Sequence, residues 1–364
     1  MASQKKLFNQ TCRNFTKLAF EQAKIYIGST GKNPSVGCIA VKKNSVISSG
    51  NTSMNGRPHA EFNCLNKNIN FAGADLYITL EPCSHKGLTP ACTNIIIKKK
   101  IKRVFFSLFD LDKRSSYKSL KILNKKKIFV KTGVLNKYGN LFYKSYLLKY
   151  TKKIPLVDAK IAISKDYFTK NKKSKYITNE HSIQRGHLLR SKYDCILATS
   201  KSINEDNSIL NCRIKGLENQ SPSIVIIDRN LNIKKKSKIL AHAKQKKIYL
   251  FTTSSNKEKE FFLKNKGVKV YKIKSMRTKV DFNKIFEILY MLGFYRVFVE
   301  AGLTFLTYLL KNNFIDSLYT FKSSFSLKKK GYNFTDNSFL KKIKLKNKIK
   351  VNLYEDILYK NKLK

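Results

Sequence analysis

The sequence has no tryptophan, six prolines and only 23 acidic residues among its 364. It also lacks long apolar runs, because its apolar stretches, such as Ile224–Ile227, are no longer than single strands. A membrane-spanning helix needs about 20 consecutive apolar residues. The chain begins with a polar, helix-like pattern and shows no signal-peptide pattern. These absences exclude an integral membrane protein with spanning helices.

Cysteine is also scarce. Seven cysteines at irregular spacings cannot all pair with one another and do not resemble a disulfide framework, so they are expected to be thiols or metal ligands. We therefore expect a reducing compartment, the cytoplasm. The apolar content of 42% is ordinary for a folded protein, and 364 residues predict two domains with a sizeable core in each.

Positive charge is abundant. The 74 lysines and arginines give a formal net charge of +51, which normally indicates a nucleic-acid partner. However, the basic residues are spread along the whole chain among asparagines and isoleucines, as in 342–350. This pattern favours a compositional drift over a shaped polynucleotide-binding face. Phosphorylated small molecules would also be attracted by this positive charge. Nucleic acid is the less favoured partner, and a homo-oligomer remains open.

Two series of alternating helices and strands follow one another along the chain. The first opens with a helix over 3–27 and has strands at 36–42, 75–80, 103–108 and 127–131. The second has strands at 157–163, 195–199, 224–227, 247–251 and 296–300. Residues 135–153 are predicted to connect the two series, and 349–353 is a candidate last strand. This alternation predicts an α/β fold.

The first series carries a set of residues suited to metal chemistry. His59-Ala60-Glu61 is followed by Pro82-Cys83 and then by Cys92. One imidazole and two thiolates suit a tetrahedral zinc with one position open for water, and zinc lowers the pKa of such a water to near neutrality. Glu61 is too near His59 in sequence to be a comfortable second ligand, so we predict that it transfers protons. His59 and Cys83 are both expected at helix starts, where the helix dipole favours a thiolate.

Simpler interpretations compete with this one. His59 can cap a helix while the cysteines fill the core. His85, two residues after Cys83, is a competing ligand in a predicted loop. The remaining cysteines are expected to be core thiols: Cys12, Cys38, Cys64, Cys195 and Cys212.

Several motifs of the first half closely resemble the bifunctional deaminase/reductase family of riboflavin biosynthesis. They are Asn33–Cys38, Pro58–Glu61 and the stretch Thr79–Cys92. Eight residues separate Cys83 from Cys92, whereas nucleoside and nucleic-acid deaminases use a tight Pro-Cys-x-x-Cys. The resemblance implies a cytidine-deaminase-like domain over 1–146, with His59, Cys83 and Cys92 on zinc and Glu61 as the catalytic residue. It also implies that Asn33 binds the pyrimidine. A turn before Pro34 is the simpler role for Asn33.

Weaker matches to the same family cover most of 155–312. The resemblance implies a dihydrofolate-reductase-like, NADPH-dependent domain over 154–364, divergent after about residue 327. The implied cofactor-binding residues are Ala162, Tyr176, Ser202, Asp206 and Gly302. The implied substrate-binding residues are Ser174, Arg190, Leu210, Arg213 and Glu300. A glycine between a strand and a helix also lets a pyrophosphate approach the helix N-terminus. Alternatively, the arginines belong to a basic surface and Glu300 caps a helix.

The resemblance implies two successive reactions. Zinc-dependent hydrolysis of 2,5-diamino-6-(phosphoribosylamino)pyrimidinone would release ammonia, and NADPH would then reduce the ribosyl group to ribityl. Arg190 and Arg213 would hold the substrate phosphate as planar forks. Some positions depart from the family pattern. Leu88 replaces a basic residue, and Tyr167 replaces a glycine. Two alternatives remain: a deaminase with a non-catalytic second domain, and a nucleic-acid (tRNA) deaminase.

Overall fold

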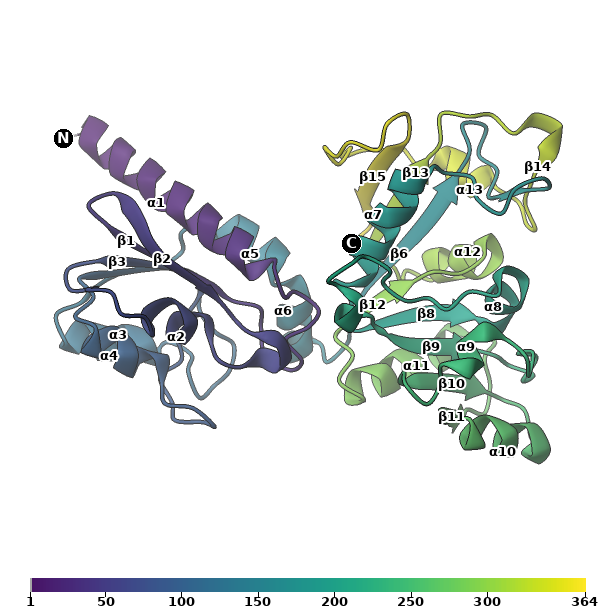
Figure 1. Ribbon diagram of the computed structural model, residues 1–364, viewed down its shortest axis with the longest axis horizontal. Helices are drawn as coiled ribbons and strands as arrows, with labels where there is room; N and C mark the ends of the chain where they lie inside the picture. Colours follow the sequence, from purple (N-terminus) through teal and green to yellow (C-terminus); the bar gives the residue numbers. More distant parts are fainter. Residues whose placement is uncertain (1) are drawn as a thin grey trace. The chain divides into compact units, whose positions relative to one another are not determined.

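The computed structural model describes residues 2–364, which divide into two compact units after Lys153 (Figure 1). Each unit is a sheet covered by helices on both faces, so the predicted α/β class is confirmed. No helix among the residues described is long and apolar enough to span a bilayer.

The first unit contains a five-stranded sheet of order β2-β1-β3-β4-β5. Strand β1 runs antiparallel to both of its neighbours, whereas β3, β4 and β5 are parallel. The strands are β1 (Gly37–Lys42), β2 (Ser45–Asn51), β3 (Asp75–Leu80), β4 (Arg103–Leu108) and β5 (Phe129–Lys131). The four strands predicted for this half correspond to β1, β3, β4 and β5, and β2 lies in the chain between the first two of them.

Helices pack on both faces of this sheet (Figure 1). Two of them contact one face: α1 (Ala2–Ala23) and α5 (Asn136–Phe142). Three others lie on the opposite face: α2 (Ala60–Leu65), α3 (Cys92–Lys98) and α4 (Lys118–Lys125). Two glycines allow close packing, because a Cβ on Gly37 would lie 1.8 Å from the Ala19 carbonyl oxygen and one on Gly50 2.4 Å from the Cys64 nitrogen. Gly50 thereby seats α2, the helix that carries Glu61.

The segment expected to be a plain connection is helical. Residues 135–153 contain α5 and α6 (Lys144–Thr151), and both belong to the first unit. Aromatic side chains explain the difference, because Tyr143 and Tyr146 are buried in the core and their hydroxyls bond to Thr79 and Asp110. The segment therefore packs against the sheet instead of spanning open solvent.

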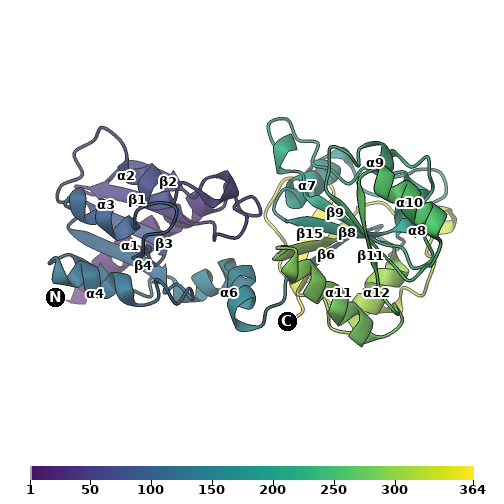
Figure 2. The ribbon, with the colours of Figure 1, turned by 90° about the horizontal axis from the view of Figure 1, so that it is seen from below.

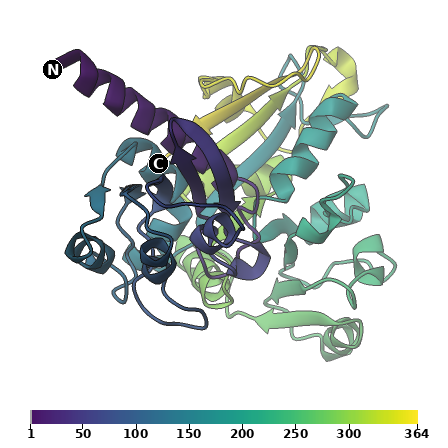
Figure 3. The same ribbon diagram turned by 60° about the vertical axis from the view of Figure 1, so that its left-hand side comes forward.

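The second unit contains an eight-stranded sheet of order β11-β10-β9-β8-β12-β6-β13-β15. All neighbouring strands are parallel except β13 and β15, the pair at one edge (Figure 3). The first strands in the chain are β6 (Leu156–Ile163), β8 (Cys195–Thr199), β9 (Ser223–Ile227) and β10 (Ile248–Thr252). The remaining ones are β11 (Val268–Lys272), β12 (Arg296–Val299), β13 (Ser317–Lys322) and β15 (Ile357–Lys362).

Two helical layers enclose this sheet (Figure 2). One layer consists of α7 (Glu180–Arg190), α8 (Ser200–Asp206), α9 (Lys238–Ala241) and α10 (Lys257–Asn265). The other consists of α11 (Lys279–Met291), α12 (Leu303–Lys311) and the short α13 (Ser338–Lys342). Single-turn 3-10 helices lie at Met54–Gly56, Glu218–Gln220 and Lys328–Lys330.

The end of the chain differs from the expectation. Residues 349–353 do not form the predicted strand, and the last strand is β15 instead. Leu353 is buried there, which explains the apolar pattern that suggested a strand. The divergent segment also forms a small two-stranded sheet, in which β14 (Gly331–Tyr332) pairs with β7 (Lys170–Asn171).

Tyr167 keeps a positive φ of 65°, so it occupies a backbone conformation that favours glycine.

Candidate active sites

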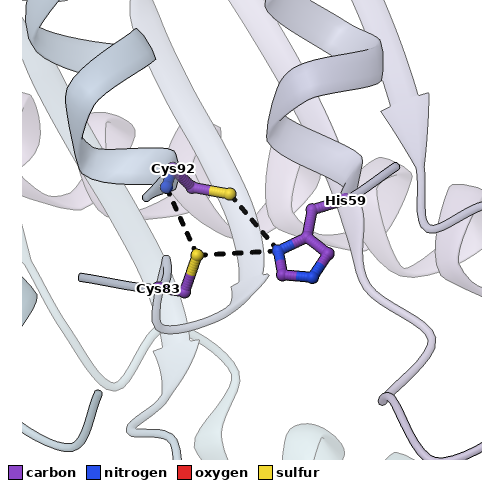
Figure 4. Close-up of side chains that lie close together, drawn as sticks. All are labelled: His59, Cys83 and Cys92. Atoms are coloured by element: carbon purple, nitrogen blue, oxygen red, sulfur yellow. Dashed lines mark hydrogen bonds between the residues drawn. The ribbon is translucent and has the colours of Figure 1, made fainter. Parts of the chain in front are cut away.

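Three side chains from separate segments of the chain converge in the first unit (Figure 4). His59 precedes the first residue of α2, Cys83 lies in the loop after β3, and Cys92 is the first residue of α3. The Nδ1 atom of His59 lies 3.6 Å from Cys83 Sγ and 3.4 Å from Cys92 Sγ, and all three donor atoms lie within 4.8 Å of one another. The spacing in the sequence is thus converted into a cluster with one nitrogen and two sulfur donors.

The cluster fits zinc. Tetrahedral coordination with Zn–N near 2.0 Å and Zn–S near 2.3 Å requires nitrogen and sulfur donors about 3.5 Å apart, close to both observed distances. A hydrogen bond from the Cys92 thiol, followed by those from His59 and the Cys92 backbone, lowers the pKa of Cys83 to about 4 against the effect of burial. Cys83 does not itself begin a helix, so that expectation is wrong. Instead, its sulfur accepts the N–H of Cys92 at the start of α3.

Glu61 lies in the first turn of α2 and is only 3% exposed. Burial, and then the negative charge of Cys83, raise the pKa of this carboxyl to about 7. The carboxyl is also in hydrogen-bonding contact with Cys92. A carboxyl group with a pKa near neutrality, placed beside a metal-binding cluster, is suited to proton transfer.

The competing ligand His85 stays outside this cluster. Its Nδ1 lies 2.9 Å from the Ser115 hydroxyl, and the group of possible metal ligands in the described residues does not include it. The five cysteines expected to be core thiols are all buried and free. Asn33 donates from Nδ2 to the Gly56 carbonyl at 2.9 Å, which ties its loop to the turn ahead of Pro58 and His59.

Two features of the loops around the cluster were not apparent from the sequence. The buried Glu81 carboxylate accepts hydrogen bonds from Asp110, Tyr117 and Ser119, and so holds the loop after β4. The Arg57 guanidinium donates to Thr89 at 2.7 Å and thereby lies against the loop between the two cysteines. In that loop Leu88, which stands where the resemblance implies a basic residue, is 88% exposed.

The second unit contains a cavity of ≈ 360 Å³ at the carboxyl ends of β6, β8 and β12, where open α/β sheets bind their ligands. It brings together residues that lie far apart in the chain. Nine of the ten positions expected from the resemblance line it: Ala162, Tyr176, Arg190, Ser202, Asp206, Leu210, Arg213, Glu300 and Gly302. Ser174, the tenth, bonds to Tyr176 beside the cavity, through both backbone groups of that residue.

Arg190 and Glu300 form an ion pair in this cavity. Arg190 donates from Nε and Nη2 to the two carboxylate oxygens of Glu300 at 2.6 and 2.8 Å. Burial would raise the pKa of Glu300, but the charge and hydrogen bonds of Arg190 outweigh it and lower the pKa to about 2. Glu300 does not cap the following helix, because the residue before α12 is Gly302.

Two of the residues expected to bind the cofactor, Ser202 and Gly302, contact each other in the cavity. Ser202 accepts the backbone N–H of Gly302 at 3.0 Å, and Thr199 caps α8 by accepting from Ser202. Asp206 pairs with Lys170 at 3.1 Å. Arg213 is exposed and donates from Nε to His187, a residue that the sequence did not single out.

Comparison with known proteins finds a match for each of the two units. Residues 9–108 match the family model of the cytidine and deoxycytidylate deaminase zinc-binding region, and residues 155–358 match that of the RibD C-terminal domain. The riboflavin biosynthesis protein RibD of Aquifex aeolicus is 33% identical over 85% of this chain and 86% of its own length. That of Bacillus amyloliquefaciens is 32% identical over 79% and 78%, respectively.

Solved structures show the same similarity. The deaminase/reductase of Thermotoga maritima has a TM-score of 0.80 and 27% identity, covering 98% of this chain and 99% of that one. Acinetobacter baumannii RibD, form 1, has a TM-score of 0.81 and 25% identity, covering 97% and 99%.

The fold and the two sites define a class: a deaminase joined on one chain to a reductase, with Zn²⁺ and NADPH as the cofactors that its parts support. The chain belongs to the family of the riboflavin biosynthesis protein RibD. It is therefore a bifunctional deaminase and reductase, and the expected fold class, with the deaminase part first, is confirmed.

Proposed function

We propose that the enzyme deaminates 2,5-diamino-6-(phosphoribosylamino)pyrimidinone and then reduces the ribosyl group of the product to ribityl. The observation that carries this proposal is the presence of two separately built sites, a nitrogen–sulfur cluster beside a buried carboxyl and a cavity at the ends of a parallel sheet. We assign deamination to residues 1–146 and reduction to residues 154–364. The free thiols support a reducing compartment, and we propose the cytoplasm.

In the first reaction, water replaces the amino group at C2 and ammonia leaves. His59, Cys83 and Cys92 would hold zinc, which when bound lowers the pKa of water so that hydroxide is available near neutral pH. Glu61 accepts a proton from the attacking water and passes it to the ring nitrogen; it then accepts the proton of the new C2 hydroxyl and passes it to the departing amine. Its buried position beside Cys92 places one carboxyl group where both relays take place. Asn33 would orient the pyrimidine.

In the second reaction, bound NADPH would supply the hydride that reduces the ribosyl group, and the accompanying proton would come from solvent. The cofactor would be bound by Ala162, Tyr176, Ser202, Asp206 and Gly302. Ser202 and Gly302 contact each other at the N-terminus of α12, and a helix N-terminus is suited to a phosphate. The substrate would lie against the other group of cavity residues. These are Ser174, Arg190, Leu210, Arg213 and Glu300.

The proposal is tested by incubating the purified protein with the diaminopyrimidine, first without and then with NADPH, and measuring the molecular masses of the products by mass spectrometry. Without NADPH we expect replacement of one amino group by oxygen and release of ammonia. Addition of NADPH should add two hydrogens to that product. Deamination that is never followed by reduction would leave the second unit as a scaffold, and unchanged substrate would contradict the proposal as a whole.

A further inference from the structure

His187 lies in α7 on the wall of the second unit's cavity and is only 5% exposed. Its Nδ1 is 2.9 Å from the carbonyl oxygen of Asn211, and its Nε2 is 3.2 Å from Nε of Arg213. A carbonyl oxygen only accepts hydrogen bonds, whereas an arginine Nε–H only donates them. Nδ1 also lies 3.2 Å from Nη1 of Arg190, but this Nη1 donates to the Asn211 carbonyl at 3.0 Å and so does not need the ring as its acceptor. The hydrogen of the ring therefore belongs on Nδ1, and Nε2 offers its lone pair to Arg213.

This arrangement treats the two cavity arginines differently. Arg190 directs Nε and Nη2 to Glu300 and Nη1 to the Asn211 carbonyl, so each of its nitrogens already has a protein partner. Arg213 is exposed, and its one hydrogen bond to the described part of the chain runs from Nε to His187. Both terminal nitrogens of Arg213 are therefore left for a ligand, and an arginine uses such a pair to bind a phosphate.

We propose that His187 is a positioning residue that orients Arg213 toward the phosphate of the reductase substrate. The inference rests on the proposed function, because that function supplies the phosphate. It assigns the phosphate contact mainly to Arg213, and it gives His187 the task of fixing the guanidinium plane through one accepted hydrogen bond.

The electrostatics of the site agree with this geometry. Burial, then the positive charge of Arg190 and that of Arg213, lower the pKa of His187 to about 4, and Glu300 and the Asn211 carbonyl only partly oppose them. The ring is consequently neutral near pH 7 and keeps the lone pair on Nε2. A protonated ring would have no acceptor for Arg213 and would repel both arginines.

The test uses substitutions that each keep one of the two hydrogen bonds. In His187→Asn the amide takes roughly the place of Nδ1, which retains a donor for Asn211 and removes the acceptor for Arg213. In His187→Gln the longer side chain places an oxygen near the position of Nε2 and retains that acceptor. His181→Asn is the matched control, because His181 is an exposed histidine on the same helix.

We expect H187N to raise KM for the deaminated, phosphorylated pyrimidine about tenfold, the size of one lost charge-assisted hydrogen bond. Neither kcat nor KM for NADPH should change much, H187Q should recover most of the loss, and H181N should match the wild type. In an Arg213→Ala background, H187N should have no further effect, because His187 acts through Arg213. NADPH binding reports that the second unit of each variant is folded, and deamination reports the same for the first unit.

Two results would overturn the inference: equal KM values for H187N and H187Q, or an H187N penalty that persists in the R213A background. Calorimetry with ribose 5-phosphate supplies a reading independent of turnover, in which H187N should bind more weakly than H187Q. If the wild type performs no reduction, the proposed function fails, whereas the calorimetric comparison still decides the role of His187.

Discussion

The two active sites differ in how the chain builds them. The cluster of the first unit uses side chains between His59 and Cys92, and its acid/base residue is two positions from one of them. The site of the second unit draws on residues from Ala162 to Gly302, and its central ion pair joins residues 110 positions apart. Metal chemistry thus depends on a few local donors, whereas substrate binding in the second unit depends on a network assembled by the sheet.

The sharpest way to separate the two sites is to remove one metal ligand. Cys92→Ala should abolish zinc binding and deamination, because two remaining donors cannot hold a zinc that keeps an open position. Zinc content is measured on the purified variant by elemental analysis. Cys12→Ala, which removes a buried thiol of the same unit, should retain the metal. Full zinc occupancy in C92A would refute the ligand assignment.

A second test keeps the metal and removes the proton carrier. Glu61→Gln should bind zinc normally and deaminate about 10²–10⁴-fold more slowly, because an amide does not shuttle protons. The measurement is the rate of ammonia release at saturating substrate. A rate near that of the wild type would show that another group performs the transfers.

The second unit should respond to the loss of its ion pair in stability as well as in activity. Glu300→Ala leaves the largely buried Arg190 guanidinium without its carboxylate, and breaking a buried pair in this way costs about 3–5 kcal/mol. Denaturant unfolding should show this loss in the second unit, while deamination stays unchanged. Equal stability of E300A and the wild type would mean that the pair contributes nothing.

The contrast between the sites also explains what the sequence could predict. His59, Glu61, Cys83 and Cys92 belong to short motifs with a fixed spacing, so the cluster could be proposed without knowledge of the fold. The strands at 75–80 and 103–108 were placed correctly because they are short, apolar and buried on both faces.

Other features depend on contacts between distant residues. The Arg190–Glu300 pair and the bond from Arg213 to His187 are formed by the order of the sheet, which no local pattern encodes. His187 lies in α7, a helix without a strong apolar face, so no pattern in the sequence indicated that this histidine belongs to the site. The burial of Tyr143 and Tyr146, which packs the helical residues 135–153 against the first sheet, likewise depends on Thr79 and Asp110.

A smaller effect is expected when the charge of the exposed arginine is kept and its shape is changed. Arg213→Lys should raise KM for the phosphorylated pyrimidine several-fold and leave NADPH affinity nearly unchanged, because an ammonium cannot bind a phosphate with two parallel N–H groups. Steady-state kinetics with each substrate varied in turn measure both constants. A rise confined to KM for NADPH would move Arg213 to the cofactor side of the cavity.

The smallest effect concerns pH. The pKa of His187 is about 4 in the folded protein and 6.5 as its ordinary value, so between these pH values the unfolded chain takes up a proton that the folded chain does not. The stability that the wild type has relative to H187Q should therefore fall as pH is lowered from 6.5 to 4. Asp194, whose pKa burial raises to about 6, acts in the opposite direction but equally in both proteins. Urea unfolding at several pH values measures the difference, and a constant difference would contradict the shift.

The central claim is that each unit holds a complete site, and the C92A variant tests it most directly. This variant is supplied with the deaminated pyrimidine and NADPH, and the oxidation of NADPH is followed together with the mass of the product. The account predicts reduction at the rate of the wild type, with two hydrogens added, although the variant cannot deaminate. Loss of reduction in C92A, with the second unit still folded and binding NADPH, would contradict it.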